Sequence, residues 1–134
     1  MRKIKIFTPG KKSFEKELAE YAKRLTSEAQ ILWVYPKDLA ALEKVLAKEK
    51  SYICLDPTGK QYSSEGFAKF LETQSANIVF VIGGDEGFTP TIQKNASALI
   101  SLSKMTFTHH MTRLILAEQI YRAIMINSGR PYHK

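Results

Sequence analysis

The 134-residue sequence contains one cysteine, which excludes a fold held together by internal disulfide bonds. That residue, Cys54, lies in the apolar run 52–55, and its immediate neighbours carry no charge that would lower its pKa. We therefore predict a buried structural residue and not a nucleophile. Three histidines and no cysteine pair argue against a zinc site, so we expect no metal.

Long apolar runs are absent as well. No segment reaches transmembrane length, and residues 1–6 (MRKIKI) alternate in polarity instead of forming the apolar stretch of a signal peptide. Repeats, linkers and low-complexity tracts are also missing, and the length suits one hydrophobic core. We expect a single domain over residues 1–134 in a soluble, cytoplasmic protein.

Acidic residues are few relative to basic ones. Twenty Lys and Arg stand against thirteen Asp and Glu, which gives a formal net charge of +7. Such an excess raises the affinity for polyanions, mostly through salt-sensitive phosphate contacts. Many small proteins are basic, however, so the charge only mildly favours nucleic acid as a partner.

The chain alternates between strand and helix patterns. Residues with period-two or continuous apolar character predict strands, and apolar residues at helical spacing predict helices. Strands are expected at 3–7, 31–35, 51–55, 78–82 and 100–103, and helices at about 14–25, 38–46, 64–71, 90–98 and 109–127. This repetition predicts an α/β fold with a mostly parallel sheet and helices on both faces.

One segment indicates where a ligand would bind. Five apolar residues, 78–82, lead directly into the glycine-rich acidic segment 83–87 (GGDEG). A strand that is apolar on both faces belongs in the middle of a covered sheet, and glycines at its carboxyl end let a ligand approach the backbone. The segment matches neither G-x-G-x-x-G nor the Walker phosphate loop. Taken alone, it fits a tight turn as well as a ligand loop.

Further motifs decide between these alternatives. The chain contains V-I-G-G-x-E-G, L-S-K-M-T, H-x-x-x-R, A-E-Q-x-Y-R-A and a terminal P-Y-H-K, in this order. Together they resemble the RlmH family of ribosomal large-subunit pseudouridine N3-methyltransferases, within the SPOUT class of knotted methyltransferases. The similarity is dense from Ile78 to Lys134 and weaker toward the N-terminus.

The resemblance implies a fold and an activity. In SPOUT proteins the last part of the chain forms a trefoil knot, and S-adenosylmethionine binds there. The implied reaction is methyl transfer from S-adenosylmethionine to N3 of a pseudouridine in 23S ribosomal RNA, in free RNA or in the assembled ribosome. The rival from another class is a non-catalytic RNA-binding or ribosome-associated module of the same fold. A phosphate-binding nucleotide site is disfavoured because Asp85 and Glu86 would repel the phosphates.

The resemblance also implies which residues hold the cofactor. They are the end of the third strand, the glycine pair and the loop before the last helix: Leu55, Gly83, Gly84, Leu102, Ser103, Lys104, Met105, Thr106 and Phe107. A sulfonium is stabilised by carbonyls and carboxylates and not by cations, so we expect backbone groups near Lys104, rather than its ammonium, to make the contact.

Candidate catalytic residues lie on both sides of the last helix. Methylation of a ring nitrogen requires the loss of its proton, and Glu86, His109 and His133 are the candidate acceptors. Arg113, one helical turn after His109, is predicted to line the site, or alternatively to bond a carboxylate across a subunit interface. Tyr132 is predicted to stack on a flipped-out base, whereas His133 fits a solvated tail equally well.

The last helix also predicts the assembly. It is apolar over more of its surface than one small core requires, which predicts a homodimer built on this helix. Two features depart from the family: Thr108 stands where proline is usual, and the segment 36–38 lacks a basic insertion that many members carry. The loss of proline would free the backbone before the helix, and any RNA contacts of the insertion are absent.

Overall fold

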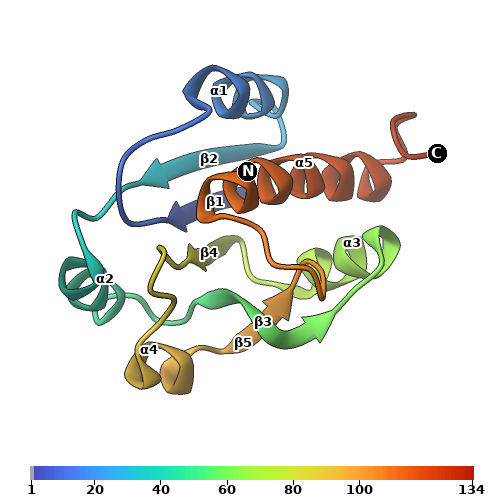
Figure 1. The fold of residues 1–134 in the computed structure, drawn as a ribbon. Helices are drawn as coiled ribbons and strands as arrows, with labels where there is room; N and C mark the ends of the chain where they lie inside the picture. Colours follow the sequence, from blue (N-terminus) through green and yellow to red (C-terminus); the bar gives the residue numbers. More distant parts are fainter. Residues whose placement is uncertain (1) are drawn as a thin grey trace.

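The computed structural model describes residues 2–134, which form a five-stranded sheet in which every pair of neighbouring strands is parallel (Figure 1). The strand order is β2-β1-β4-β3-β5. The strands are β1 (Arg2–Phe7), β2 (Ala29–Val34), β3 (Ile53–Gln61), β4 (Asn77–Ile82) and β5 (Ala98–Ser101), and the helices are α1 (Glu15–Arg24), α2 (Leu39–Leu46), α3 (Ser64–Thr73), α4 (Pro90–Asn95) and α5 (His109–Asn127).

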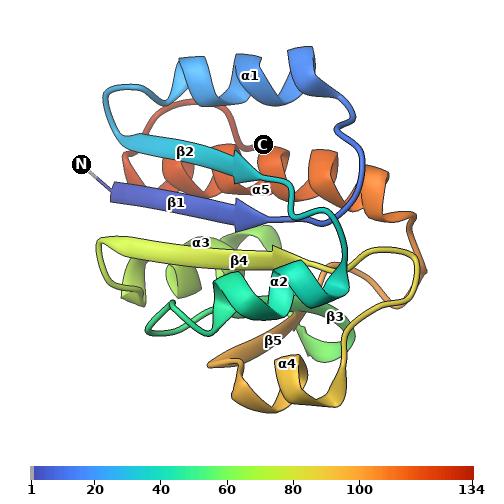
Figure 2. The same cartoon turned by 90° about the vertical axis from the view of Figure 1, so that its left-hand side faces the viewer.

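Helices cover both faces of the sheet. In Figure 2, α2 and α4 lie in front of the sheet, and α3 and α5 lie behind it. The side chains of β4 divide between the two layers: Ile78, Phe80 and Ile82 pack with α3 and α5, whereas Val79 and Val81 pack with α2 and α4. The continuous apolar run in the sequence therefore reflects a strand that is buried on both faces, and the predicted α/β architecture is confirmed.

Side-chain caps begin several of the helices. The side chains of Asp38, Ser63 and Thr89 each accept a hydrogen bond from a backbone N–H in the first turn that follows. The hydroxyl of Thr108 does the same for α5, accepting from the N–H of Met111 at 3.2 Å. Although Thr108 replaces the usual proline, its cap fixes the start of the last helix.

The third strand is longer than predicted. Leu55 pairs with Ile100, the residues 56–59 leave the ladder, and pairing resumes when Lys60 also meets Ile100. A side chain at Gly59 would place its Cβ 2.4 Å from the backbone of Leu99, so only glycine permits this close approach. The predicted end of the strand at Leu55 is thus the start of a bulge inside a longer strand.

The fourth helix ends, and the fifth strand begins, a few residues earlier in the chain than predicted. Helix α4 ends at Asn95 and β5 runs from Ala98 to Ser101. The reason is Ser97, whose backbone N–H and hydroxyl both donate to the carbonyl of Tyr52, at 2.8 and 3.0 Å. This contact draws the following residues alongside β3.

Cys54 lies in the centre of the sheet. It is fully buried, as predicted, and burial together with the nearby Asp56 raises the pKa of its thiol to about 12. The thiol therefore stays protonated near neutral pH and serves as a small apolar side chain.

Within residues 2–134, no helix combines the length and the apolar character needed to span a membrane.

Candidate active site

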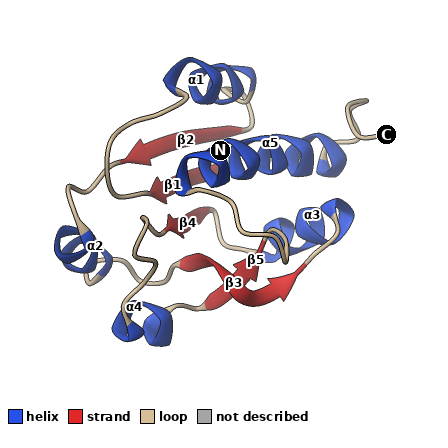
Figure 3. Cartoon of the chain, in the orientation of Figure 1, coloured by secondary structure: helices blue, strands red, loops and turns tan. Residues whose placement is uncertain are grey.

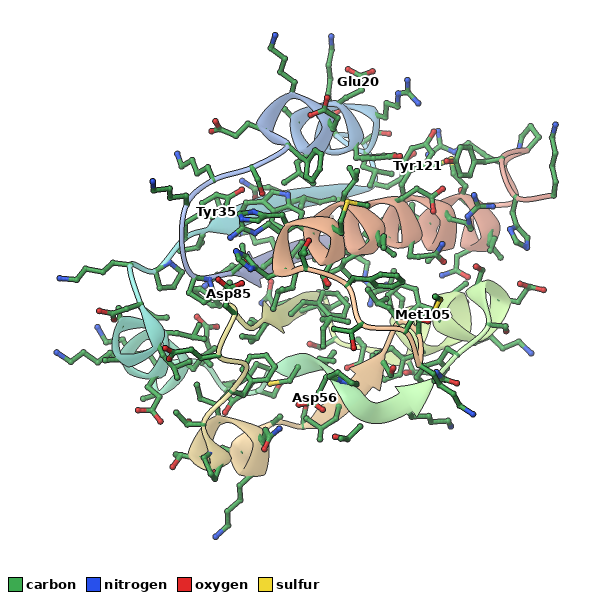
Figure 4. All side chains as sticks on the ribbon, viewed as in Figure 1. Glu20, Tyr35, Asp56, Asp85, Met105 and Tyr121 are labelled. Atoms are coloured by element: carbon green, nitrogen blue, oxygen red, sulfur yellow. The ribbon has the colours of Figure 1, made fainter. Side chains whose placement is uncertain are left out.

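A cavity of about 510 Å³ lies at the carboxyl ends of β4 and β5, beside the point in β3 where its pairing with β4 ends at Leu55 and the bulge begins. In open parallel sheets, ligands bind outside the carboxyl ends of the strands. Its walls come from the end of β3, the glycine loop after β4, and the long loop that leads from β5 to α5, drawn in tan in Figure 3. Figure 4 labels one residue from each of these walls, Asp56, Asp85 and Met105.

The cavity gathers most residues that the family resemblance assigned to the cofactor. They come from three strand ends, and the fold brings them around one space. Among its lining residues are Leu55, Gly83, Gly84, Leu102, Ser103, Met105, Thr106 and Phe107. Lys104 does not line the cavity, although both of its neighbours do. The contact of backbone groups near Lys104 with the cofactor stays a prediction.

The charge of the cavity wall is opposite to that of the whole protein. The chain carries a net charge of +7, yet within residues 2–134 no lysine or arginine lines the cavity, whereas Asp56 and Asp85 do. Apolar side chains such as Leu55, Phe88 and Leu102 form much of the remaining wall. A wall of this kind suits a ligand with a flat apolar ring and a positive charge, which is the chemistry of S-adenosylmethionine.

Asp56 is a site residue that the sequence reasoning missed. Its side chain is almost buried, with 7% of the residue exposed. One carboxylate oxygen accepts from the backbone N–H and the hydroxyl of Thr58, at 2.9 and 2.6 Å, and the other accepts from Gln93 Nε2 at 2.7 Å. Burial alone would raise the pKa of Asp56, but these hydrogen bonds outweigh it and lower the pKa. The signal that could have found Asp56 is a carboxylate that directly follows the apolar run 52–55.

The glycine loop folds back on itself. The N–H of Gly87 donates to the carbonyl of Gly84 at 3.0 Å, and Gly87 has a φ of 73°, in the left-handed region that favours glycine. A Cβ at Gly83 would lie 3.2 Å from the carbonyl group of Gly87. The close contact between these two backbone segments shapes one wall of the cavity.

We expect the substitution Gly83→Val to weaken cofactor binding. The added side chain must push the Gly87 segment away, and this deforms the cavity wall, so the affinity for S-adenosylmethionine should fall at least about tenfold, or 1.4 kcal/mol. Isothermal titration calorimetry measures the affinity, and thermal unfolding reports whether the variant is folded. An unchanged affinity in a folded variant would remove this loop from the site.

His109 is the predicted catalytic residue that the structure places at the cavity. As the first residue of α5 it lines the cavity, and its Nδ1 lies 2.9 Å from Oδ1 of Asp85. Glu86 belongs to the same glycine loop but does not line the cavity. Its role as a proton acceptor stays a prediction.

Arg113 points away from the cavity and holds the loop between β1 and α1. It is fully buried, with 0% exposed, and its Nε donates to the hydroxyl of Thr8 at 2.7 Å. Its other nitrogens donate to the carbonyls of Lys11 and Pro9, at 2.6 and 3.0 Å, and to the hydroxyl of Ser13 at 2.8 Å. Burial lowers the pKa of Arg113. Within its own chain this cation is satisfied by neutral acceptors, and it neither lines the cavity nor bonds a carboxylate.

The C-terminal tail lies against the side of α5. The hydroxyl of Tyr132 donates to Glu118 at 2.6 Å, and the edge of its ring packs against Tyr121 with 4.7 Å between centroids. Nδ1 of His133 lies 2.9 Å from Arg122, and its Nε2 lies 3.2 Å from a carboxylate oxygen of Glu65. Neither tail residue lines the cavity.

The tail contacts hold a charged cluster together. Arg122 and Glu118, four residues apart on α5, form an ion pair at 2.8 Å. Burial alone would raise the pKa of Glu118, but hydrogen bonds from Arg122 and Tyr132 lower it. The bond to Glu118, aided by burial, raises the pKa of Tyr132 to about 12, so its hydroxyl remains a donor near neutral pH.

Among residues 2–134 there is no group of His, Cys, Asp or Glu that could hold a metal ion.

Comparison with known proteins identifies the family. The family model described as "Predicted SPOUT methyltransferase" matches residues 2–133. The chain is 46% identical over 141 residues to Ribosomal RNA large subunit methyltransferase H of Protochlamydia amoebophila, with all of both chains covered. The chain belongs to the SPOUT methyltransferase family. The namesake from Ligilactobacillus salivarius is 41% identical, with 98% of this chain and 99% of the relative covered.

Solved structures agree on the fold of this SPOUT methyltransferase. A Haemophilus influenzae protein assigned to a methylase family matches with a TM-score of 0.61 and 8% identity, over 98% of this chain and 70% of the other. A Legionella pneumophila protein assigned as a methyltransferase, solved with bound S-adenosylmethionine, matches with a TM-score of 0.51 and 12% identity, over 92% and 66%. Enzymes of the SPOUT family use S-adenosylmethionine as methyl donor, and the resemblance drawn from the sequence motifs is confirmed.

Proposed function

We propose that this protein methylates N3 of a pseudouridine in 23S ribosomal RNA, in the context of the assembled ribosome. The observation that carries the proposal is the cavity at the carboxyl ends of β4 and β5 and the bulge of β3, which no lysine or arginine of residues 2–134 lines, in a chain with a net charge of +7. The wall suits a cationic methyl donor, and the basic surface suits a polyanionic substrate. The names of the curated relatives indicate large-subunit ribosomal RNA as that substrate.

The residues around the cavity supply binding and proton transfer. Bound S-adenosylmethionine supplies an electrophilic methyl group. The apolar wall with Leu55 and Leu102 would hold an adenine ring, and the carboxylates of Asp56 and Asp85 would favour a positive charge nearby. The target nitrogen must lose its proton, for which His109 stands at the cavity. A nucleotide phosphate, by contrast, would find no cation among the lining residues.

The proposal includes a homodimer and the trefoil knot of the SPOUT class. Apolar side chains on α5 support the dimer, because Met111 is 41% exposed and Leu114, Ile115 and Tyr121 are only partly covered. The tail supports it as well. Tyr132 is bonded to Glu118, six residues after Thr112, the last residue of α5 that lines the cavity, and therefore about 9 Å farther along the helix. A second subunit packed on α5 would bring its own tail toward this cavity.

Methyl transfer to ribosomes tests the proposal directly. The protein is incubated with labelled S-adenosylmethionine and either ribosomes that lack the modification or the corresponding free 23S RNA. We expect label in the large-subunit RNA of the ribosome sample, and mass spectrometry of its nucleosides should find N3-methylpseudouridine. Binding to ribosomes without any transfer of label would favour the non-catalytic module instead.

A further inference from the structure

The glycine loop and the start of α5 meet in a side-chain contact that no motif of the sequence indicated. Asp85 lies on the loop after β4, beside the start of α5 (Figure 4). Its Oδ1 is 2.9 Å from Nδ1 of His109, and both residues line the cavity. The side chain of Asp85 is largely exposed, whereas that of His109 is only 12% exposed. An exposed loop carboxylate thus contacts a ring that is itself largely buried.

This contact decides which ring nitrogen of neutral His109 carries the proton. An ionised carboxylate can only accept hydrogen bonds, so Nδ1 must donate to Asp85, and Nε2 then keeps its lone pair. Nε2 has no hydrogen-bond partner within residues 2–134. It does not belong to the side-chain atoms that are both fully buried and unpaired, so it remains accessible. Gly10 lies near this nitrogen but leaves space around it, because even a Cβ added at Gly10 would lie 3.9 Å from Nε2. The proton-accepting nitrogen is therefore left free.

His110 supports the ring from a second direction. The two imidazoles lie 3.9 Å apart between centroids. Nδ1 of His110 is 2.7 Å from the hydroxyl of Ser13 and 3.3 Å from the guanidinium of Arg113. Burial and the charges of His109 and Arg113 lower the pKa of His110, so it stays neutral near pH 7 and adds no second positive charge beside His109. Asp85 fixes the edge of the His109 ring, and His110 fixes its face.

We propose that Asp85 is a positioning residue that holds His109 in the tautomer with a free Nε2, and that His109 Nε2 takes the N3 proton of the target base. This inference rests on the proposed function. The other two candidate acceptors are placed less well. Glu86 does not line the cavity, and His133 is engaged by Arg122 and Glu65 at the side of α5.

The step balances without an oxidant or reductant. The N–H bond at N3 breaks and its proton moves to Nε2 of His109. The electron pair left on N3 forms the bond to the methyl carbon, while the methyl–sulfur bond breaks and its pair stays on sulfur, which becomes neutral. The imidazolium then faces the carboxylate of Asp85, which stabilises the new positive charge until the proton passes to solvent.

The ring-nitrogen NMR spectrum of ¹⁵N-histidine-labelled protein tests the positioning without any RNA. The signal of His109 is assigned by its loss in His109→Gln. In the wild type we expect the neutral ring to be protonated at Nδ1. In Asp85→Ala this preference should disappear in favour of the Nε2-protonated form, which predominates in free histidine. A wild-type ring protonated at Nε2, or a tautomer that does not respond to Asp85→Ala, would overturn the positioning role.

Single-turnover methyl transfer tests the catalytic part. In Asp85→Ala the transfer rate at saturating S-adenosylmethionine should fall by roughly tenfold to a hundredfold. The affinity for S-adenosylmethionine should fall less than the rate, because the carboxylate that is lost is largely exposed, and the affinity for the ribosome should change less than about twofold. Glu72→Gln, an exposed acid on α3, removes the same charge and should leave the rate unchanged. A shifted tautomer with an unchanged rate would exclude His109 as the acceptor. No transfer by the wild type would overturn the proposed function and this catalytic step, whereas the NMR result would still decide the contact between Asp85 and His109.

Discussion

Deletion of residues 131–134 will abolish methyl transfer and leave the affinity for S-adenosylmethionine within about twofold of the wild-type value. The residues that line the cavity end at Thr112, so the deletion removes none of them. It does remove Tyr132 and His133, the residues proposed to position the target base. Contacts made only with the substrate in the transition state disappear while cofactor binding is kept, and this lowers the transfer rate without weakening the cofactor complex. Calorimetry and single-turnover transfer measure the two effects separately.

A shorter deletion provides the control. Removal of Lys134 alone takes away one exposed residue and should leave the transfer rate unchanged. If the protein lacking residues 131–134 methylates at the full rate, the tail is passive and the substrate site lies elsewhere.

Mixed dimers can show which subunit supplies the tail. One subunit lacks residues 131–134 and keeps an intact cavity, and the other keeps the tail and carries Gly83→Val. Each parent homodimer should be inactive. If the tail acts on the partner's cavity, the mixed dimer regains one complete site and therefore about half of the wild-type activity per dimer. If the tail acts within its own chain, no complete site forms and the mixture remains inactive.

The parts of this protein that could be predicted from sequence are those set by local pattern. The apolar run of β4 and the glycines after it specify a buried strand and a backbone that a ligand can approach. The terminal motifs then identified the family, and through it the residues from three strand ends that the cavity brings together. The cap at Thr89 and the length of α5 followed from neighbouring residues in the same way.

The remaining features depend on contacts between residues far apart in the chain. The bulge in β3 requires the approach of Gly59 to Leu99, and the orientation of His109 depends on Asp85, 24 residues earlier. Helical spacing correctly placed Arg113 on the buried side of α5, but it could not show that the partners would come from the loop after β1, about 100 residues away. No local pattern encodes such a pairing.

Replacement of Arg113 by methionine will destabilise the fold by about 3 to 5 kcal/mol, which is the range for breaking a buried polar network. The flexible methionine side chain has nearly the same length but donates no hydrogen bond. The carbonyls of Pro9 and Lys11 and the hydroxyl of Thr8 would lose a buried donor. The same loop holds Phe14 at a φ of 52°, a strained value for this residue, which persists only while the surroundings fix it.

Urea unfolding at one fixed protein concentration measures this loss, because the stability of the proposed dimer would depend on concentration. Arg24→Met is the matched control. Arg24 also forms an ion pair, with Glu20 at 3.0 Å, but both side chains are about half exposed, so its replacement should change the free energy of unfolding far less than the replacement of Arg113. Arg113→Lys keeps the charge but lacks the planar fork, and one ammonium cannot reach every acceptor that the guanidinium contacts, so an intermediate loss is expected. If Arg113→Met lowers the free energy of unfolding no more than Arg24→Met does, the loop between β1 and α1 is held by its other contacts. The support that Arg113 and Ser13 give to His110 beside the cavity would then not be needed for stability.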